Sequence, residues 1–299
     1  METTKITSSS VNFKPQTAQM ANVTELKKIA TQVRRDIIRM TNSAESGHPG
    51  GSLGCADFIT ALYFEVMDYS TPFEMNGLGE DIFFLSNGHI SPLFYSVLAR
   101  AGFFEISELA TFRKLDSRLQ GHPATAEGLP GVRVASGSLG QGLSVAVGAA
   151  LAKKLNGDKS LVYSLHSDGE MQEGQNYEAM MFAVHHKVDN LIATVDLNGQ
   201  QIDGPTNRVM NLGDIKAKWS AFGWEVLQMN GNVTEEVLDV LNTAKEETGK
   251  GRPVVIIMKT VMGWGVDFME DDYRWHGVAP NDDEMTIALS QLDETLGDY

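Results

Sequence analysis

The sequence contains little cysteine and no long apolar run, and each absence excludes a class of protein. A single cysteine, Cys55, excludes an internal disulfide and indicates a reducing compartment, where it would be a small buried hydrophobe. No stretch approaches the roughly 20 apolar residues of a membrane span, and the first residues lack the apolar core of a signal peptide. These absences predict a cytoplasmic protein that has no membrane partner.

Positive charge is also scarce. There are 24 Lys and Arg residues against 39 Asp and Glu residues, which gives a formal net charge of -15. This balance argues against nucleic acid as a partner, because nucleic acid favours basic surfaces, and anionic lipids would be repelled too. An anionic substrate would therefore need locally placed cations or a metal ion.

Apolar spacing divides the chain into alternating helices and strands. Residues 1–22 are rich in Ser, Thr, Asn and Gln and are expected to form a flexible lead-in, with Met20 as an alternative start. The spacing predicts helices at 23–40, 55–67, 91–102, 143–155, 173–186 and 234–247, and strands at 81–85, 161–166, 191–196, 224–228 and 254–259. This order predicts one α/β domain over residues 23–299, with a mostly parallel sheet, helices on both faces and a trailing C-terminal segment.

An aspartate stands at the end of one predicted strand, in the stretch "SLHSDGEMQEGQNYEAMMFAV". Asp168 and Gly169 occupy its strand-to-helix turn, on the edge of the sheet where open α/β folds bind ligands. The helix that follows offers free N–H groups to an anion. A simple capping role for Asp168 is the alternative, because Asp-Gly pairs are common in turns.

The next strand along the chain also ends in polar residues, Asp196 and Asn198. Because parallel strands end on the same side of a sheet, Asp168 and Asn198 are expected to converge. Carboxylate and amide oxygens suit Mg²⁺ or Ca²⁺ rather than zinc, and such a cation beside a helix N-terminus would neutralise a diphosphate. Asn198 on its own would be read as an Asn-Gly turn.

Four of the seven histidines adjoin a glycine: His48 in "SGHPGG", His89 in "SNGHIS", His122 in "QGHPA" and His276 in "RWHGV". A histidine in such a loop is accessible to a ligand and can shuttle protons near pH 7. The segments "SGHPGGSLG" and 121–142 are expected to be irregular loops, and long irregular stretches are usually functional. The remaining histidines, His166, His185 and His186, are assigned to solvated loops or a helix surface.

Taken together, these motifs resemble the transketolase family. The segment "SDGEMQEGQNYEAMMFAVHHKVDNLIATVDLNGQQIDG" resembles the thiamine diphosphate fingerprint, and "SGHPGGSLG", "LSNGH", "GHP" and "SGSLGQGLSVAVGAALA" resemble transketolase loops in the same order. The resemblance covers about residues 23–280. It departs at Ser167, where the family has glycine and where the serine adds a side chain close to the diphosphate.

The resemblance implies a role for each matching residue. The implied ligands of Mg²⁺, with Ca²⁺ as the alternative, are Asp168, Asn198 and the backbone carbonyl of Gln200. Those implied for the cofactor are His89, Gly137 and Gly169. Those implied for holding the sugar substrate and exchanging protons with it are His48, His122 and His276. Glu173 and Glu178 would reach a subunit interface near the aminopyrimidine, although Glu173 is equally typical of helix N-terminal charge.

The resemblance covers only the first half of a transketolase. The other half holds the pyrimidine-binding and C-terminal domains, which carry the glutamate that activates the pyrimidine and most cations that hold the substrate phosphate. The chain thus resembles the N-terminal subunit of a split transketolase, which needs a C-terminal subunit to transfer a two-carbon ketol unit from a ketose phosphate to an aldose phosphate. Self-association, or an assembly of two copies of each chain, is expected.

Two other readings remain. One is the diphosphate-binding subunit of another thiamine enzyme, such as a deoxyxylulose phosphate synthase or a 2-oxo acid dehydrogenase. The three substrate histidines favour transketolase, because sugar hydroxyls need several polar partners. The other is a non-catalytic paralogue that only binds a partner, which the presence of Asp168, Asn198 and the loop histidines disfavours.

Overall fold

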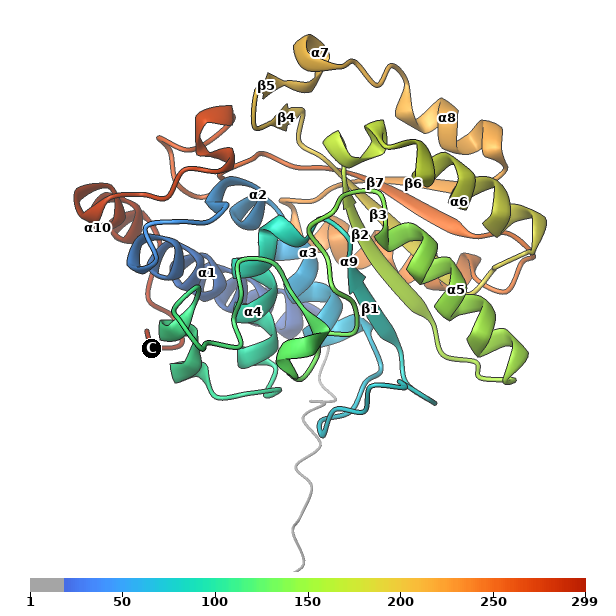
Figure 1. Ribbon diagram of the computed structural model, residues 1–299, viewed down its shortest axis with the longest axis horizontal. Coiled ribbons are helices and arrows are strands. Elements are labelled where there is room, and N and C mark those ends of the chain that lie inside the picture. The colour runs from blue at the N-terminus through green and yellow to red at the C-terminus, as the bar shows by residue number, and fades with distance from the viewer. Residues whose placement is uncertain (1–18) are drawn as a thin grey trace, which may run out of the picture.

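A parallel β-sheet organises residues 19–299, the part of the chain that the computed structural model describes (Figure 1). The strand order is β1, β2, β3, β7, β6, and each strand is parallel to its neighbours. The strands are β1 Ile82–Leu85, β2 Val162–Ser167, β3 Leu191–Leu197, β6 Glu225–Asn230 and β7 Val254–Lys259. The predicted α/β class with a parallel sheet is confirmed.

Helices cover both faces of the sheet, as predicted (Figure 1). One face carries α1 Gln19–Ser43, α3 Ala56–Ala61, α4 Ser91–Arg100 and α9 Thr234–Glu247. The other face carries α5 Gly142–Leu155, α6 Gly174–His185 and α8 Ile215–Phe222. The lead-in predicted for residues 1–22 lies outside the described residues as far as residue 18, and α1 includes its last four positions.

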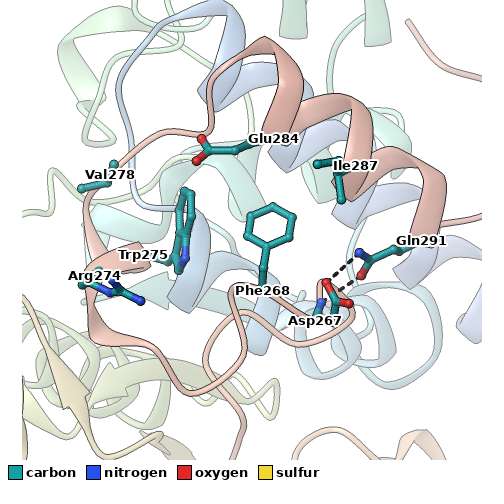
Figure 2. A pocket seen from close by; sticks show the side chains of 8 residues that line it. All are labelled: Asp267, Phe268, Arg274, Trp275, Val278, Glu284, Ile287 and Gln291. Carbon is teal, nitrogen blue, oxygen red and sulfur yellow. Dashed lines mark hydrogen bonds between the residues drawn. The ribbon is translucent and has the colours of Figure 1, made fainter.

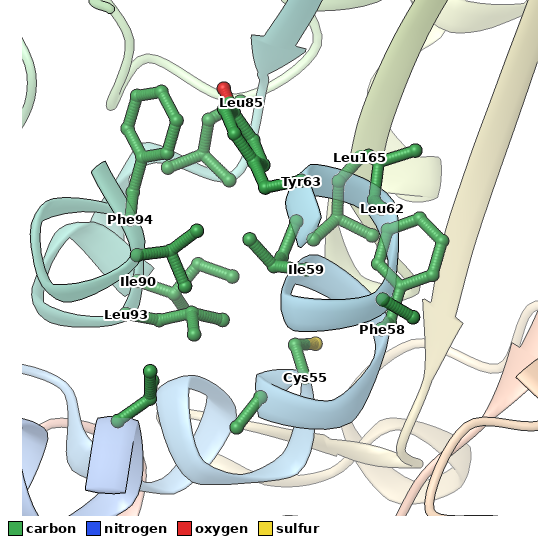
Figure 3. Packing of buried hydrophobic residues seen from close by; sticks show 14 of the residues in the cluster. Cys55, Phe58, Ile59, Leu62, Tyr63, Leu85, Ile90, Leu93, Phe94 and Leu165 are labelled. Carbon is green, nitrogen blue, oxygen red and sulfur yellow. The ribbon is translucent and has the colours of Figure 1, made fainter. Parts of the chain in front are cut away.

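The strands contribute side chains to two hydrophobic cores, one on each face of the sheet, because successive side chains of a strand point to opposite faces. In β1, Phe83 packs into the core under α1, α3 and α4, whereas Ile82 packs into the core under α5 and α6. Figure 3 shows the first core, which includes Ile59 of α3, Leu93 of α4 and Leu165 of β2. A sheet that is covered on both faces has strands that are continuous apolar runs, and this is why its strands could be read from the sequence.

Two segments differ from the predictions. The segment "SGHPGGSLG", predicted as a loop, contains α2 (Pro49–Gly54), which begins at a proline suited to the first helical position. Its glycines allow close packing, since a Cβ on Gly54 would lie 2.9 Å from the carbonyl oxygen of Val261. The helix predicted at 55–67 is α3 followed by a π-helical turn, Leu62–Val66.

The structure also adds elements that were not predicted. They are the hairpin of β4 (Gln200–Gln201) and β5 (Gly204–Pro205), α7 (Thr206–Val209), α8, and α10 (Asp282–Gln291). Helix α10 begins with a capping box formed by Asn281 and Glu284, a signal that the sequence does contain. Within residues 19–299, no helix is both long enough and apolar enough to span a membrane.

Candidate functional site

The turns after β2 and β3 meet at Asp168 and Asn198. Asp168 is fully buried, and its two carboxylate oxygens accept the N–H groups of Gly169 and Gly199, each at 2.7 Å. The amide of Asn198 donates to Asp196 at 2.7 Å and accepts the N–H of Gln200 at 2.9 Å. Asp168 thus bonds directly to the turn of Asn198, and it also caps the 3-10 turn Gly169–Gln172.

Two buried carboxylates, those of Asp168 and Asp196, lie at this pair of turns. Burial raises the pKa of Asp168 to about 7, and the neighbouring charge of Asp196 adds to the rise. Burial likewise raises the pKa of Asp196. Within residues 19–299, no group of three or more His, Cys, Asp or Glu side chains could hold a metal ion. A cation at this point would therefore be bound by one carboxylate together with amide and backbone oxygens, as hard cations allow.

The four loop histidines gather into one cluster. The ring of His48 lies 5.2 Å from that of His89, 6.2 Å from that of His122 and 5.8 Å from that of His276, measured between centroids. His89 and His276 are stacked at 5.2 Å. The four histidines come from four separate segments. These are the start of α2, the 3-10 turn Gly88–Ile90 after β1, the loop before α5, and the 3-10 turn Tyr273–His276.

The cluster is held in its neutral form. Burial lowers the pKa of His48 to about 4, with further lowering by His276, Arg113 and His122. Burial also lowers the pKa values of His89, His122 and His276. A neutral imidazole has one donor and one acceptor nitrogen, which suits it to bind hydroxyl groups.

Several buried polar atoms near the cluster have no hydrogen-bond partner in the protein. They include Nδ1 of His48, Nδ1 of His276, both amide atoms of Asn87 and the hydroxyl of Ser136. Buried polar groups are nearly always hydrogen-bonded in native proteins. Such a set of unpaired atoms beside four neutral rings therefore favours a polar ligand with several donors and acceptors.

Glycines bring the surrounding loops together. Gly137 has a φ of +131°, and a Cβ on it would lie 2.8 Å from the ring of His122. A Cβ on Gly88 would lie 2.3 Å from the hydroxyl oxygen of Ser136, so the segments of His89 and Gly137 pack against each other through glycine. At Gly169 a Cβ would lie 3.7 Å from Cβ of Gln201, an ordinary van der Waals contact.

The remaining predicted residues divide into exposed and buried ones. Glu173 and Glu178 are exposed on and just before α6, where their predicted interface role stays a prediction. His185 and His186 are exposed at the end of α6, as predicted. The prediction for His166 was wrong, because it is a fully buried residue of β2 whose ring bonds the Ser164 hydroxyl at 2.9 Å.

A separate groove of about 680 Å³ lies between α10 and the segment before it (Figure 2). Figure 2 shows the rings of Phe268 and Trp275 facing the groove, and Asp267 joined by hydrogen bonds to Gln291 of α10. The remaining lining residues are Arg274, Val278, Glu284 and Ile287. The predicted cofactor and substrate residues do not line this groove.

Sequence reasoning missed three residues around the site. Asn87 lies two positions before His89, and its place in the motif "SNGH" could have identified it as a site residue. Arg113, whose side chain donates to Ser46 at 3.1 Å, and Glu170, a buried carboxylate, carry no pattern that marks them.

Comparison with known proteins identifies the family. The family model described as "Transketolase, thiamine diphosphate binding domain" matches residues 26–295. The chain is 39% identical to a subunit of the apulose-4-phosphate transketolase of Actinobacillus succinogenes, over 90% of this chain and 96% of that one. It is 38% identical to human transketolase, over 84% of this chain but 39% of the human protein.

A solved structure agrees with these relatives. The transketolase of Campylobacter jejuni superposes with a TM-score of 0.81 at 34% identity, covering 89% of this chain and 42% of that chain. The chain thus spans nearly all of the apulose-4-phosphate relative and about two fifths of the longer transketolases. The chain belongs to the transketolase family and contains its thiamine diphosphate-binding domain.

Proposed function

We propose that this chain binds thiamine diphosphate with Mg²⁺, or with Ca²⁺ in its place, and acts with a second chain to transfer a two-carbon ketol unit from a ketose phosphate to an aldose phosphate. One carbon–carbon bond of the donor breaks and one forms to the acceptor aldehyde, without net oxidation. The observation that carries the proposal has two parts. The protein contains a cluster of four neutral histidines, and its turns at Asp168 and Asn198 are joined by a hydrogen bond.

The residues at the strand ends fit a diphosphate and a cation. Asp168 would supply the charged metal ligand, and Asn198 with the carbonyl of Gln200 would supply neutral oxygens. Gly169, which has no side chain, would let the backbone approach the diphosphate closely, and His89 and Gly137 would contact the cofactor. When bound, thiamine diphosphate supplies the nucleophilic carbon that carries the ketol unit.

The histidines fit the sugar. His48, His122 and His276 would bind substrate hydroxyls, because neutral rings donate and accept at once and two of their nitrogens are buried without a partner. A neutral ring can also accept the proton of a substrate hydroxyl as a general base. Glu173, just before α6, would take part in catalysis from the subunit interface near the aminopyrimidine of the cofactor.

A second chain is proposed because a relative that matches this chain over nearly its whole length is named as one subunit of a transketolase. The apulose-4-phosphate relative is matched over 96% of its length, whereas the longer transketolases of human and Campylobacter jejuni are matched over 39% and 42% of theirs. Glu173 and Glu178 are exposed on a surface that the partner, or a second copy of this chain, would cover. We expect self-association through this region and an assembly of two copies of each chain.

A coupled assay tests the proposal. This chain and the candidate partner, a C-terminal transketolase subunit, would be purified separately. Transfer from a ketose phosphate to an aldose phosphate would be measured for each chain and for the mixture. Light scattering would report whether the chains associate. We expect activity from the mixture only. Full activity from this chain alone would overturn the two-chain arrangement, and an inactive mixture that nevertheless associates would overturn the reaction.

A further inference from the structure

A buried carboxylate lies beneath the proposed cofactor site. Glu170 is fully buried, two positions after Asp168. Its Oε1 accepts the hydroxyl of Ser86 and the N–H of Gly140, the latter at 2.8 Å. Its Oε2 accepts the N–H of Ser167 at 3.2 Å and lies 3.6 Å from Nδ1 of His166.

The three bonded partners belong to three different segments, each close in sequence to a proposed cofactor residue. Ser86 directly follows β1 and stands three positions before His89. Gly140 follows Gly137 by three positions. Ser167 ends β2 directly before Asp168.

The same network extends into the helices that begin at these segments. The Ser86 oxygen also accepts the N–H of Gly142 at 3.1 Å, at the first residue of α5. A Cβ on Gly142 would lie 2.3 Å from that oxygen, so glycine is required for the approach. The backbone carbonyl of Glu170 accepts the side-chain amide of Asn176, in α6, at 2.7 Å.

A carboxylate is a costly way to fill a buried position, because it must be removed from water, and an apolar side chain of similar volume often gives equal or greater stability. Glu170 bonds to groups on separate segments, so its fixed geometry sets the positions of those segments relative to one another. Ser167 and Glu170 are joined by a second hydrogen bond, in which the hydroxyl oxygen of Ser167 accepts the N–H of Glu170 at 3.3 Å.

From this geometry we infer that Glu170 is a positioning residue. Its hydrogen bonds hold the segments of His89, Gly137 and Asp168 in one fixed arrangement, so that the cofactor contacts all three together. We call this set of hydrogen bonds the tie. The inference rests on the proposed function where it names the cofactor. The tie itself belongs to this chain alone and can be tested without a ligand.

The first test is hydrogen exchange of the chain by itself, with a matched pair of variants. Ser86→Ala removes a buried hydroxyl that donates to Glu170, and Ser96→Ala removes a buried hydroxyl that donates to the buried carboxylate of Asp36 at 2.6 Å. We expect Ser86→Ala and Glu170→Gln to speed exchange in peptides covering 86–90, 137–142 and 166–170, and Ser96→Ala to leave all three unchanged. Unchanged exchange in both site variants, or an equal effect of Ser96→Ala, would overturn the tie.

The second test is calorimetric titration of the two-chain assembly with thiamine diphosphate and Mg²⁺. Loss of a residue that orients ligands typically weakens metal affinity about tenfold to a hundredfold, so we expect at least a tenfold rise in Kd for Glu170→Gln and none for Ser96→Ala. A normal Kd despite faster exchange would overturn the positioning role. Failure of the unaltered assembly to bind the cofactor would instead count against the proposed function, and the exchange result would still decide the tie.

Discussion

Two groups of polar side chains in this protein contrast in how well they are paired. The first is the clamp formed by Gln32 and Arg35 of α1 with Asp298. Arg35 donates to both carboxylate oxygens of Asp298, at 2.9 and 2.7 Å, and to the carbonyls of Leu289 and Leu292. Gln32 also donates to Asp298, at 2.8 Å. The second is the histidine cluster, where buried nitrogens lack partners.

The pKa shifts express the same difference. The hydrogen bond from Arg35 lowers the pKa of Asp298 to about 2, because the charged form is satisfied. Burial lowers the pKa of His48 to about 4, because the charged form has no partner. A paired group of this kind stabilises the fold, whereas an unpaired buried group costs stability and is expected where a ligand completes it. Substitutions in the clamp and in the proposed site should therefore have different consequences.

The largest effect is expected at Asp168. Asp168→Ala should weaken Mg²⁺-dependent binding of thiamine diphosphate by more than about a hundredfold, because loss of a group that merely supports a ligand already costs tenfold to a hundredfold. The measurement is calorimetric titration of the two-chain assembly. Asp298→Ala serves as the control and should lower stability without changing affinity. Unchanged affinity in Asp168→Ala would remove the metal assignment.

The histidines proposed to bind substrate should affect turnover rather than cofactor binding. His122→Ala and His276→Ala each remove a group proposed to bond a substrate hydroxyl, and loss of one such bond to a transition state costs about 2–4 kcal/mol, or about thirtyfold to a thousandfold in rate. Steady-state kinetics with a ketose phosphate measure this. The exposed His185→Ala is the control, and normal rates in both site variants would return these histidines to a structural role.

The cluster should also make the fold sensitive to mild acid. Because the pKa of His48 is lowered from 6.5 to about 4, the unfolded chain binds a proton in this range that the folded chain does not. The contribution of His48 to the free energy of unfolding should therefore fall by about 2 kcal/mol as the pH drops from 6.5 to 4, after allowance for partial exposure, whereas the raised pKa of Asp168 contributes in the opposite direction. In denaturant titrations, His48→Gln should remove this contribution from the dependence of the unfolding free energy on pH, and the exposed His186→Gln should not. Parallel curves would contradict the prediction.

The clamp should act at lower pH and with a smaller effect. Since Asp298 has its pKa lowered from 3.8 to about 2, its contribution is fully present above pH 3.8 and is lost as the pH falls toward 2. Solvent screening limits the loss to about 1 kcal/mol. Asp298→Asn should lower stability at pH 7 and remove the slope between about pH 4 and 2. An unaltered slope would mean that other carboxylates dominate there.

The sequence was sufficient to predict the sheet and one part of the site. The apolar strands follow from burial on both faces, and the meeting of the Asp168 and Asn198 turns follows because parallel strands end at the same edge. His166 was misplaced because a polar residue in such a strand gives no sign of its buried partners.

The histidine cluster could not be derived from local pattern. His48 and His276 lie at opposite ends of the sequence, and only tertiary packing brings their rings to 5.8 Å. The role of Glu170 was equally hidden, because its bonds run to the end of β1 and to the loop before α5. The helix α2 was missed because its glycines, which usually indicate a loop, serve here to pack against the segment of Val261.

The most direct measurement is calorimetric titration of thiamine diphosphate, in the presence of Mg²⁺, into this chain, into the candidate partner and into the two together. We predict one site per copy of this chain in the mixture, abolished by a chelator and by Asp168→Ala. Failure of the associated chains to bind thiamine diphosphate, or binding that Asp168→Ala leaves intact, would contradict the assignment of this chain as the diphosphate-binding half of the enzyme.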